Sequence, residues 1–192
     1  MVNQKMKQLG QNRSVIRDIF EYGRRRKEQI GEENVFDFSL GNPSVPAPEI
    51  LTQTLERLIK DTPPQLLHAY TSAAGDDGVR RAVAEYLNNT YDAGVSPDYI
   101  YMTCGAAASL TISLTALTEP GDEAAVFAPF FPEYRIFAEQ AGAKLKVIPS
   151  RKGDFQADAD EIEKGITPAT KCLIINSPNN PTGAVLTDES IQ

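Results

Sequence analysis

Residues 172–183 read CLIINSPNNPTG, an apolar run that passes directly into a loop of small, polar and proline residues. The run Cys172–Ile175 is typical of a strand buried on both faces. The loop contains two X-Pro bonds and a glycine, which restrict its backbone to a rigid turn. In open α/β sheets the carboxyl ends of the strands form the edge where ligands bind. We therefore expect this loop to aim an amide side chain at a ligand.

Strand-like and helix-like segments alternate regularly before this loop. Such alternation with short links predicts an α/β fold with three α/β/α layers and a mostly parallel sheet. The expected strands are 99–103, 124–128, 143–148 and 171–176, and the expected helices are 106–117, 133–140 and 158–165.

A helical segment is expected to precede the sheet. Its helices are a first one capped by Ser14 and running to about Glu28, then 49–60 and the amphipathic stretch 79–87, with a short strand at 35–39. The stretch 187–190 has the acidic first turn of a new helix, but only two residues follow it. We therefore expect the sequence to be the amino-terminal part of a longer chain.

Composition narrows the class of protein. The 192 residues are 41% hydrophobic and carry a net charge of −7, as is usual for a globular protein. Residues 1–30 carry +5, leaving −12 on the rest, which would repel phosphate backbones, so no nucleic-acid partner is expected. No run is long enough to span a membrane and no signal peptide is visible.

The two cysteines, Cys104 and Cys172, lie in strand-like runs. We expect both to be buried, reduced thiols, which places the protein in the cytoplasm. They lack metal-ligand spacing, and the single histidine, His68, cannot complete a zinc site with them. No metal is expected.

Residues 103–109, TCGAAAS, follow an expected strand and open an expected helix. The free N–H groups of the first turn and the positive end of the helix dipole favour an anion there. Small side chains let a phosphate approach the backbone closely. Tight packing of a helix on a sheet would select small residues equally well, so both interpretations stand on this segment alone.

Residues 128–134, APFFPEY, end the next expected strand at the same edge. Phe130 and Phe131 are explained by packing in the core. An aromatic ring at the carboxyl end of a strand can also lie against a planar ligand.

In their order along the chain, these segments resemble one family, the class I pyridoxal-phosphate aminotransferases of fold type I. The resemblance covers residues 38–192, and its most specific part is the Asn-Pro-Thr-Gly loop. The matching segments are 39–43, 70–71 with Gly75, 79–84, 103–106, 120–123, 129–134 and 176–183.

The resemblance implies pyridoxal 5'-phosphate as cofactor. It implies that the backbone of Gly105, Ala106 and Ala107 binds the cofactor phosphate, that Phe131 stacks on the pyridine ring, and that Asn180 hydrogen-bonds the phenolic oxygen.

The same resemblance implies roles for two earlier residues. Gly41 would meet the α-carboxylate of the substrate, and Tyr70 would reach the cofactor phosphate of the neighbouring subunit in a homodimer. A half-exposed loop tyrosine without such a role is the alternative for Tyr70. Cis peptide bonds are implied at Ala128-Pro129 and Asn180-Pro181.

The domain organisation implied is an amino-terminal arm with part of the small domain (1–40) and the first part of the cofactor-binding large domain (41–192). The activity implied is transfer of an amino group between an amino acid and a 2-oxo acid. The family's catalytic lysine is expected beyond residue 192, because no lysine here has its context. A carbon–sulfur β-lyase with the same cofactor, and a non-catalytic cofactor- or ligand-binding module, remain alternatives.

Overall fold

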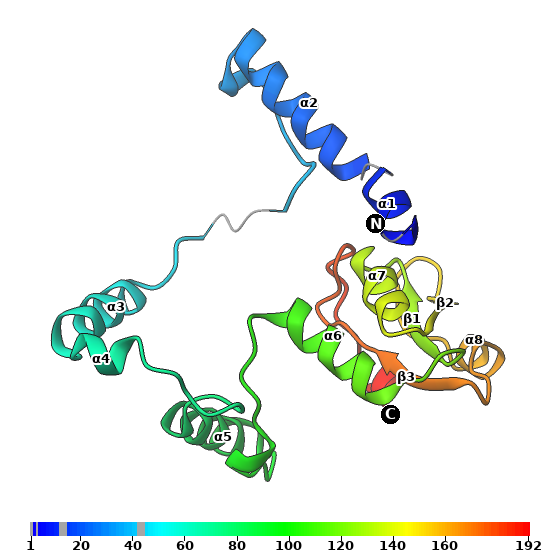
Figure 1. The fold of residues 1–192 in the computed structure, drawn as a ribbon. Helices are drawn as coiled ribbons and strands as arrows, with labels where there is room; N and C mark the ends of the chain where they lie inside the picture. Colours follow the sequence, from blue (N-terminus) through cyan, green and yellow to red (C-terminus); the bar gives the residue numbers. More distant parts are fainter. Residues whose placement is uncertain (1, 3, 12–14, 42–44) are drawn as a thin grey trace. The chain divides into compact units, whose positions relative to one another are not determined.

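The computed structural model describes residues 2, 4–11, 15–41 and 45–192. By internal contacts the chain divides into two units, Met1–Ala69 and Tyr70–Gln192. Figure 1 shows the order of their helices and strands. The predicted domain boundary after residue 40 stays a prediction.

The described part of the first unit is helical. Its elements are α1 (Gln4–Gln11), α2 (Val15–Ile30), η1 (Glu32–Asn34), α3 (Glu49–Asp61) and α4 (Pro64–Leu67). Helix α3 begins directly after Pro48 and carries Glu49 in its first turn, where an acid suits the helix dipole. The predicted cap Ser14 lies outside the described residues. Helix α1 was not predicted.

The expected strand at 35–39 is wrong, because these residues lie in extended and bent backbone without strand pairing. A strand is defined by a hydrogen-bonded neighbour, and the described part of the first unit contains none. Local contacts hold the segment instead. The carboxylate of Asp37 accepts a hydrogen bond from the Ser39 backbone at 3.0 Å and lies 3.7 Å from Lys27 Nζ.

The second unit contains the sheet. Its elements are α5 (Asp77–Tyr91), η2 (Pro97–Tyr99), α6 (Ala106–Leu117), β1 (Glu123–Ala128), α7 (Glu133–Gln140), β2 (Lys144–Pro149), α8 (Ala159–Gly165), β3 (Thr170–Ile174) and α9 (Asp188–Ile191). The strands are parallel in the order β2-β1-β3. The predicted α/β class is confirmed, and helices α6 and α7 begin and end at the predicted residues.

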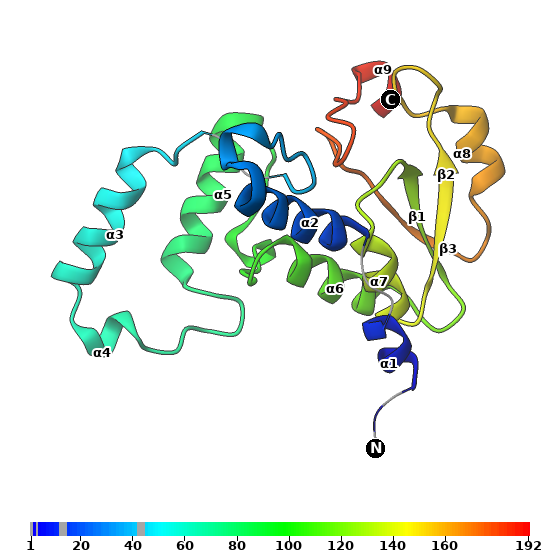
Figure 2. The same cartoon turned by 90° about the horizontal axis from the view of Figure 1, so that it is seen from above.

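The strand order fixes where the helices lie. The chain moves from β1 outward to β2 through α7, and then back across β1 to β3 through α8. Because crossovers between parallel strands are right-handed, opposite directions of travel place the two helices on opposite faces of the sheet. Figure 2 shows α7 and α8 on the two sides of the strands.

Each face of the sheet has its own apolar contacts. On one face Leu114 of α6, Ala124 of β1 and Ala138 of α7 form a buried cluster. On the other face Ile148 of β2 is fully buried against Gly165, the last residue of α8. A Cβ at position 165 would meet Ile148 Cγ1 at 2.8 Å, so this approach requires glycine.

The expected strand 99–103 is wrong. Tyr99 ends the short helix η2, and residues 100–103 lie in irregular backbone whose Met102 amide donates to the carbonyl of Ala74 at 2.9 Å. No strand of the described chain pairs with the segment. The prediction that Cys104 is buried is also wrong, because this thiol is exposed in the bend before α6. Cys172 is partly buried in β3.

No helix within the described residues is long and apolar enough to cross a membrane.

Glu123 joins the starts of β1 and β3. Its carboxylate accepts hydrogen bonds from the hydroxyls of Thr167 at 2.8 Å and Thr170 at 3.2 Å. These bonds, chiefly that of Thr167, hold the pKa of Glu123 below its usual value. A carboxylate whose folded pKa is lowered stabilises the fold above its unfolded pKa and loses that contribution as pH falls through the folded value.

Replacing Glu123 by Gln is therefore expected to lower the free energy of unfolding at pH 7. The difference from the unmodified protein should shrink below a pH of about 4.3, where the carboxylate of the unfolded chain is protonated. Chemical denaturation at pH values above and below this point measures the difference in the free energy of unfolding. Glu163→Gln on the exposed surface of α8 is the matched control, and an equal pH dependence in both variants would contradict the assignment.

Candidate functional site

The loop after β3 is held by its own polar groups at the carboxyl edge of the sheet. The amide of Asn180 donates to Asn176 Oδ1 at 2.8 Å, and the amide of Gly183 donates to the carbonyl of Asn179 at 2.7 Å. The amide of Asn179 in turn donates to the carbonyl of Ala184 at 2.9 Å. The predicted rigid loop is thus present as a closed turn.

Asn179 joins this loop to the one that follows β1. Its side-chain Nδ2 donates to the carbonyl of Pro129 at 3.1 Å and to Thr182 Oγ1 at 2.9 Å. Pro129 lies two residues before Phe131, and Asn179 directly precedes Asn180. The contact therefore brings two of the predicted site segments, 50 residues apart in sequence, to one place.

The implied cis peptide bonds at Ala128-Pro129 and Asn180-Pro181 are both present. A third, at Ser177-Pro178, was not predicted.

The side chain of Asn180 is exposed at this edge. Its amide group forms no hydrogen bond with the described part of the chain, whereas the side chains of Asn176 and Asn179 are used within the loop. The loop therefore presents one unengaged amide, at the position predicted to contact a ligand.

Phe131 lies at the start of α7, on the carboxyl side of β1. Its ring is partly buried and meets Tyr134 edge-on, with ring centroids 5.7 Å apart. Burial raises the pKa of the Tyr134 hydroxyl. In a perpendicular pair at most one face of the Phe131 ring is covered by Tyr134, so a planar ligand can stack on the opposite face.

Phe130 has a different environment, because its side chain lines a cavity beneath the two loops. The cavity measures about 20 Å³, which suits a water molecule and excludes a cofactor. It is lined mainly by strand ends and loop residues: Val126, Phe127, Phe130, Tyr134, Ser150, Phe155, Ile174, Asn176, Asn179, Ala184 and Leu186.

Helix α6 begins at Ala106 after Gly105, which has φ of 87° and leaves open space where a Cβ would stand. No side chain caps the helix. The first-turn amides of residues 106–108 form no hydrogen bond within the described residues, so they are available to an anion. Because α6 is linked to the amino end of β1 by five residues and packs on it through Leu114, its first turn points toward the carboxyl edge.

The two remaining predicted residues are exposed. Tyr70 begins the second unit, and its side chain is fully accessible at 107% of the reference area. Gly41 lies in the first unit, with no heavy atom within 4 Å of the Cβ it lacks. Its neighbours 42–44 lie outside the described residues.

One acidic group near the site lacks a partner. Glu133, the first residue of α7, has a buried Oε2 atom with no hydrogen bond to the described chain. An acid at this position suits the positive end of the α7 dipole. Two amide side chains also gained importance only from the structure: Asn179, described above, and the buried Gln156 of the loop between β2 and α8.

This parallel sheet, covered by helices on both faces and carrying polar loops at its carboxyl edge, has the architecture of fold type I enzymes. The chain belongs to the family of class I and class II aminotransferases, whose model matches residues 33–192. The resemblance seen in the sequence is confirmed.

Known relatives agree with this assignment. Aspartate aminotransferase of Thermotoga maritima is 32% identical over 83% of this chain, and that of Pyrococcus horikoshii is 33% identical over 92%. The solved structure of an aminotransferase from Eubacterium rectale is 50% identical and has a TM-score of 0.96 over all of this chain. The chain spans 42% and 43% of the two aspartate aminotransferases and 48% of the Eubacterium protein.

Asn179→Ala is expected to loosen the Asn-Pro-Thr-Gly loop. It removes the side-chain bonds to Pro129 and Thr182, and each such bond stabilises the native state by about 1 kcal/mol. The two bonds together amount to about 2 kcal/mol, so hydrogen exchange at the amides of Gly183 and Ala184 should accelerate by up to roughly 30-fold.

The matched control is Asn88→Ala. Asn88 lies in the last turn of α5, and its side chain forms two hydrogen bonds with Val95 in the loop that follows. This variant should accelerate exchange at Val95 only. Unchanged exchange at Gly183 in Asn179→Ala would show that the side chain does not hold the loop.

Proposed function

We propose that this chain forms the cofactor-binding part of an aminotransferase that uses pyridoxal phosphate to exchange an amino group between an amino acid and a 2-oxo acid. The observation that carries the proposal is the family match over residues 33–192. The contact between the loops after β1 and β3 supports it, because it gathers the stacking and amide positions at one edge.

The residues at this edge fit the cofactor. An anionic phosphate suits the uncapped first turn of α6, where Gly105, Ala106 and Ala107 present backbone amides and no bulky side chain. A planar ring suits the partly exposed ring of Phe131. When bound, pyridoxal phosphate withdraws electrons from the substrate's α-carbon, and the protein contributes binding, orientation and electrostatics.

Asn180 is assigned to the phenolic oxygen of the cofactor. Its unengaged Nδ2 donates a hydrogen bond there, and a bond to the charged form of an oxygen lowers its pKa. The turn that holds Asn180 limits its motion before the cofactor arrives, which reduces the entropic cost of forming that bond.

Gly41 is assigned to the α-carboxylate of the substrate through its backbone. Tyr70 is assigned to the cofactor phosphate of a second copy of the chain, so the active enzyme is a homodimer. Its fully exposed ring supports this assignment, because a side chain buried within its own unit could not extend to a partner.

The lysine that holds the cofactor covalently is assigned to a part of the protein outside residues 1–192, since covalent chemistry requires a desolvated lysine next to the ring. We place the enzyme in the cytoplasm, because Cys104 and Cys172 form no disulfide and free thiols suit a compartment that keeps cysteines reduced.

The full-length enzyme tests the reaction class directly. Assays with amino acid and 2-oxoglutarate pairs should show exchange of the amino group, whereas cystathionine should not be cleaved. Cleavage without exchange would establish the β-lyase alternative. Absence of any cofactor absorbance after incubation with pyridoxal phosphate would overturn the proposed function.

Asn180→Ala in the full-length enzyme should raise the pH midpoint of the bound cofactor's absorbance by about one to two units, because a hydrogen bond to a charged group contributes about 1.5–3 kcal/mol. Turnover should fall roughly 10- to 100-fold for the same reason. Absorbance titration and steady-state kinetics measure these effects. Asn89→Ala, on the exposed surface of α5, is the control. If both quantities stay unchanged, Asn180 does not have the assigned role.

A further inference from the structure

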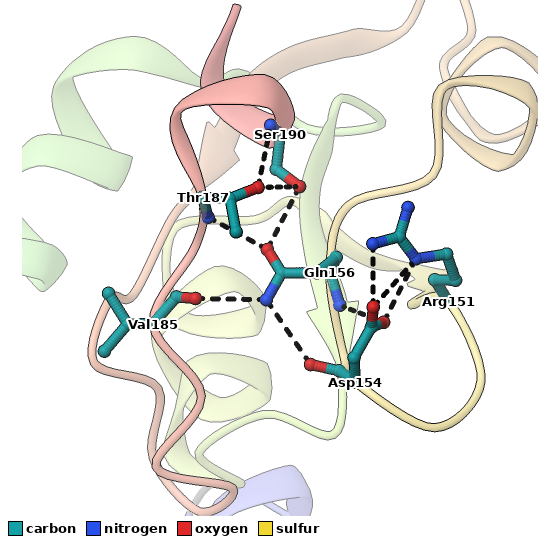
Figure 3. Close-up of polar contacts among 6 residues, drawn as sticks. All are labelled: Arg151, Asp154, Gln156, Val185, Thr187 and Ser190. Atoms are coloured by element: carbon teal, nitrogen blue, oxygen red, sulfur yellow. Dashed lines mark hydrogen bonds and ion pairs between the residues drawn. The ribbon is translucent and has the colours of Figure 1, made fainter.

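Gln156 is a buried amide in the loop between β2 and α8, with 6% of its surface exposed. A buried amide destabilises the fold unless its donors and acceptors are engaged. Both the nitrogen and the oxygen of the Gln156 side-chain amide form hydrogen bonds, and its principal partners lie about 30 residues later in the chain (Figure 3).

The bonds of Gln156 converge on the segment that follows the Asn-Pro-Thr-Gly loop. Nε2 donates to the carbonyl of Val185 at 3.0 Å. Oε1 accepts from the amide of Thr187 at 3.0 Å and from Ser190 Oγ at 3.1 Å. A longer bond of 3.4 Å runs from Nε2 to the carbonyl of Asp154. The nitrogen and the oxygen of one side-chain amide thus both hold residues 185–190 in place.

The main chain around Gln156 is fixed by an ion pair. Arg151 Nη2 lies 2.7 Å from Asp154 Oδ2, and the other oxygen of Asp154 accepts from the amide of Gln156 at 3.2 Å. The guanidinium of Arg151 is the main reason that the pKa of Asp154 lies below its usual value. The carbonyl of Gln156 also accepts from the amide of Arg151 at 2.8 Å, which closes the turn.

The segment that Gln156 holds is tied back to the Asn180 loop. The amide of Leu186, between Val185 and Thr187, donates to Ser177 Oγ at 3.0 Å. The carbonyl of Ala184 accepts a hydrogen bond from the amide of Asn179 at 2.9 Å. Residues 176–177, at the start of the loop, follow directly from β3, which fixes their position. Residues 184–187, at the end of the loop, do not continue into a strand. Their position therefore depends on contacts outside the loop.

We propose that Gln156 is a positioning residue for the cofactor site, because it fixes the returning side of the loop and thereby the direction of the Asn180 amide. The proposal rests on the function proposed above, in which Asn180 contacts the cofactor. Gln156 itself need not touch the cofactor, since its amide is used up by contacts within the chain.

The test is a double-mutant cycle in the full-length enzyme with Gln156→Leu and Asn180→Ala. Gln156→Leu alone should raise the pH midpoint of the cofactor's absorbance in the same direction as Asn180→Ala and weaken pyridoxal phosphate binding by about tenfold, corresponding to one or two lost hydrogen bonds. In the Asn180→Ala background, Gln156→Leu should leave the midpoint unchanged, because the group through which it acts is gone.

Hydrogen exchange without cofactor gives a readout that is independent of catalysis. Gln156→Leu should accelerate exchange at the amides of Leu186 and Thr187, and Gln156→Met should do the same, because neither side chain can donate to Val185 or accept from Thr187 and Ser190. Gln156→Met keeps the unbranched length of glutamine, so it supplies a second variant if Gln156→Leu does not fold.

Thr118→Val is the matched control, since it removes one buried hydrogen bond, from the Thr118 hydroxyl to the carbonyl of Leu114, at the far end of α6. It should lower stability without moving the absorbance midpoint. An equal midpoint shift by Gln156→Leu with and without Asn180, or unchanged loop exchange, would overturn the positioning role. If the unmodified enzyme binds no pyridoxal phosphate, the proposed function fails instead, whatever exchange shows.

Discussion

Parallel pairing on both sides of β1 is the constraint that organises the second unit. Because β2 and β3 flank β1 in the same direction, all three strands end at one edge, and the loops that follow them must meet there. Right-handed connections then send α7 and α8 to opposite faces, which buries β1 between two layers. The small side chains of Ala124 and Ala125, both fully buried, allow those layers to approach.

Side chains fasten this sheet at both of its edges. At the amino edge Glu123 binds two hydroxyls next to the start of β3, and at the carboxyl edge Asn179 binds the carbonyl of Pro129 after β1. Both links join β1 to β3 across more than 40 residues of sequence. Gln156 adds a third link from the outer strand β2, so each strand contributes to the loop that presents Asn180.

Much of this could be predicted from the sequence, for a local physical reason. Strands β1 and β3 are short apolar runs and α6 and α7 have clear starts, so their residues alone indicate their structure. The segment 99–103 is also strand-like, but a strand needs a paired neighbour, and the described chain offers none. Cys104, predicted to be buried with that segment, is exposed for the same reason.

The site divides in the same way. Asn180, Phe131 and the amides after Gly105 were predicted because motifs carry them. Gln156 has no local pattern, since its partners lie 29 to 34 residues away and only the fold brings them together. In the sequence, a glutamine between apolar and acidic residues cannot be distinguished from an ordinary loop residue, because only the structure shows that it is buried.

The conformation of Gly105 has a consequence for chirality at the phosphate-binding turn. With φ of 87° and open space around it, the position is restricted by the handedness of natural amino acids and not by lack of room. A D-alanine introduced there by chemical ligation can adopt this φ with ease, whereas L-alanine would have to rotate the amides that follow. The direction of the anion-binding amides is thus a stereochemical property of a single residue.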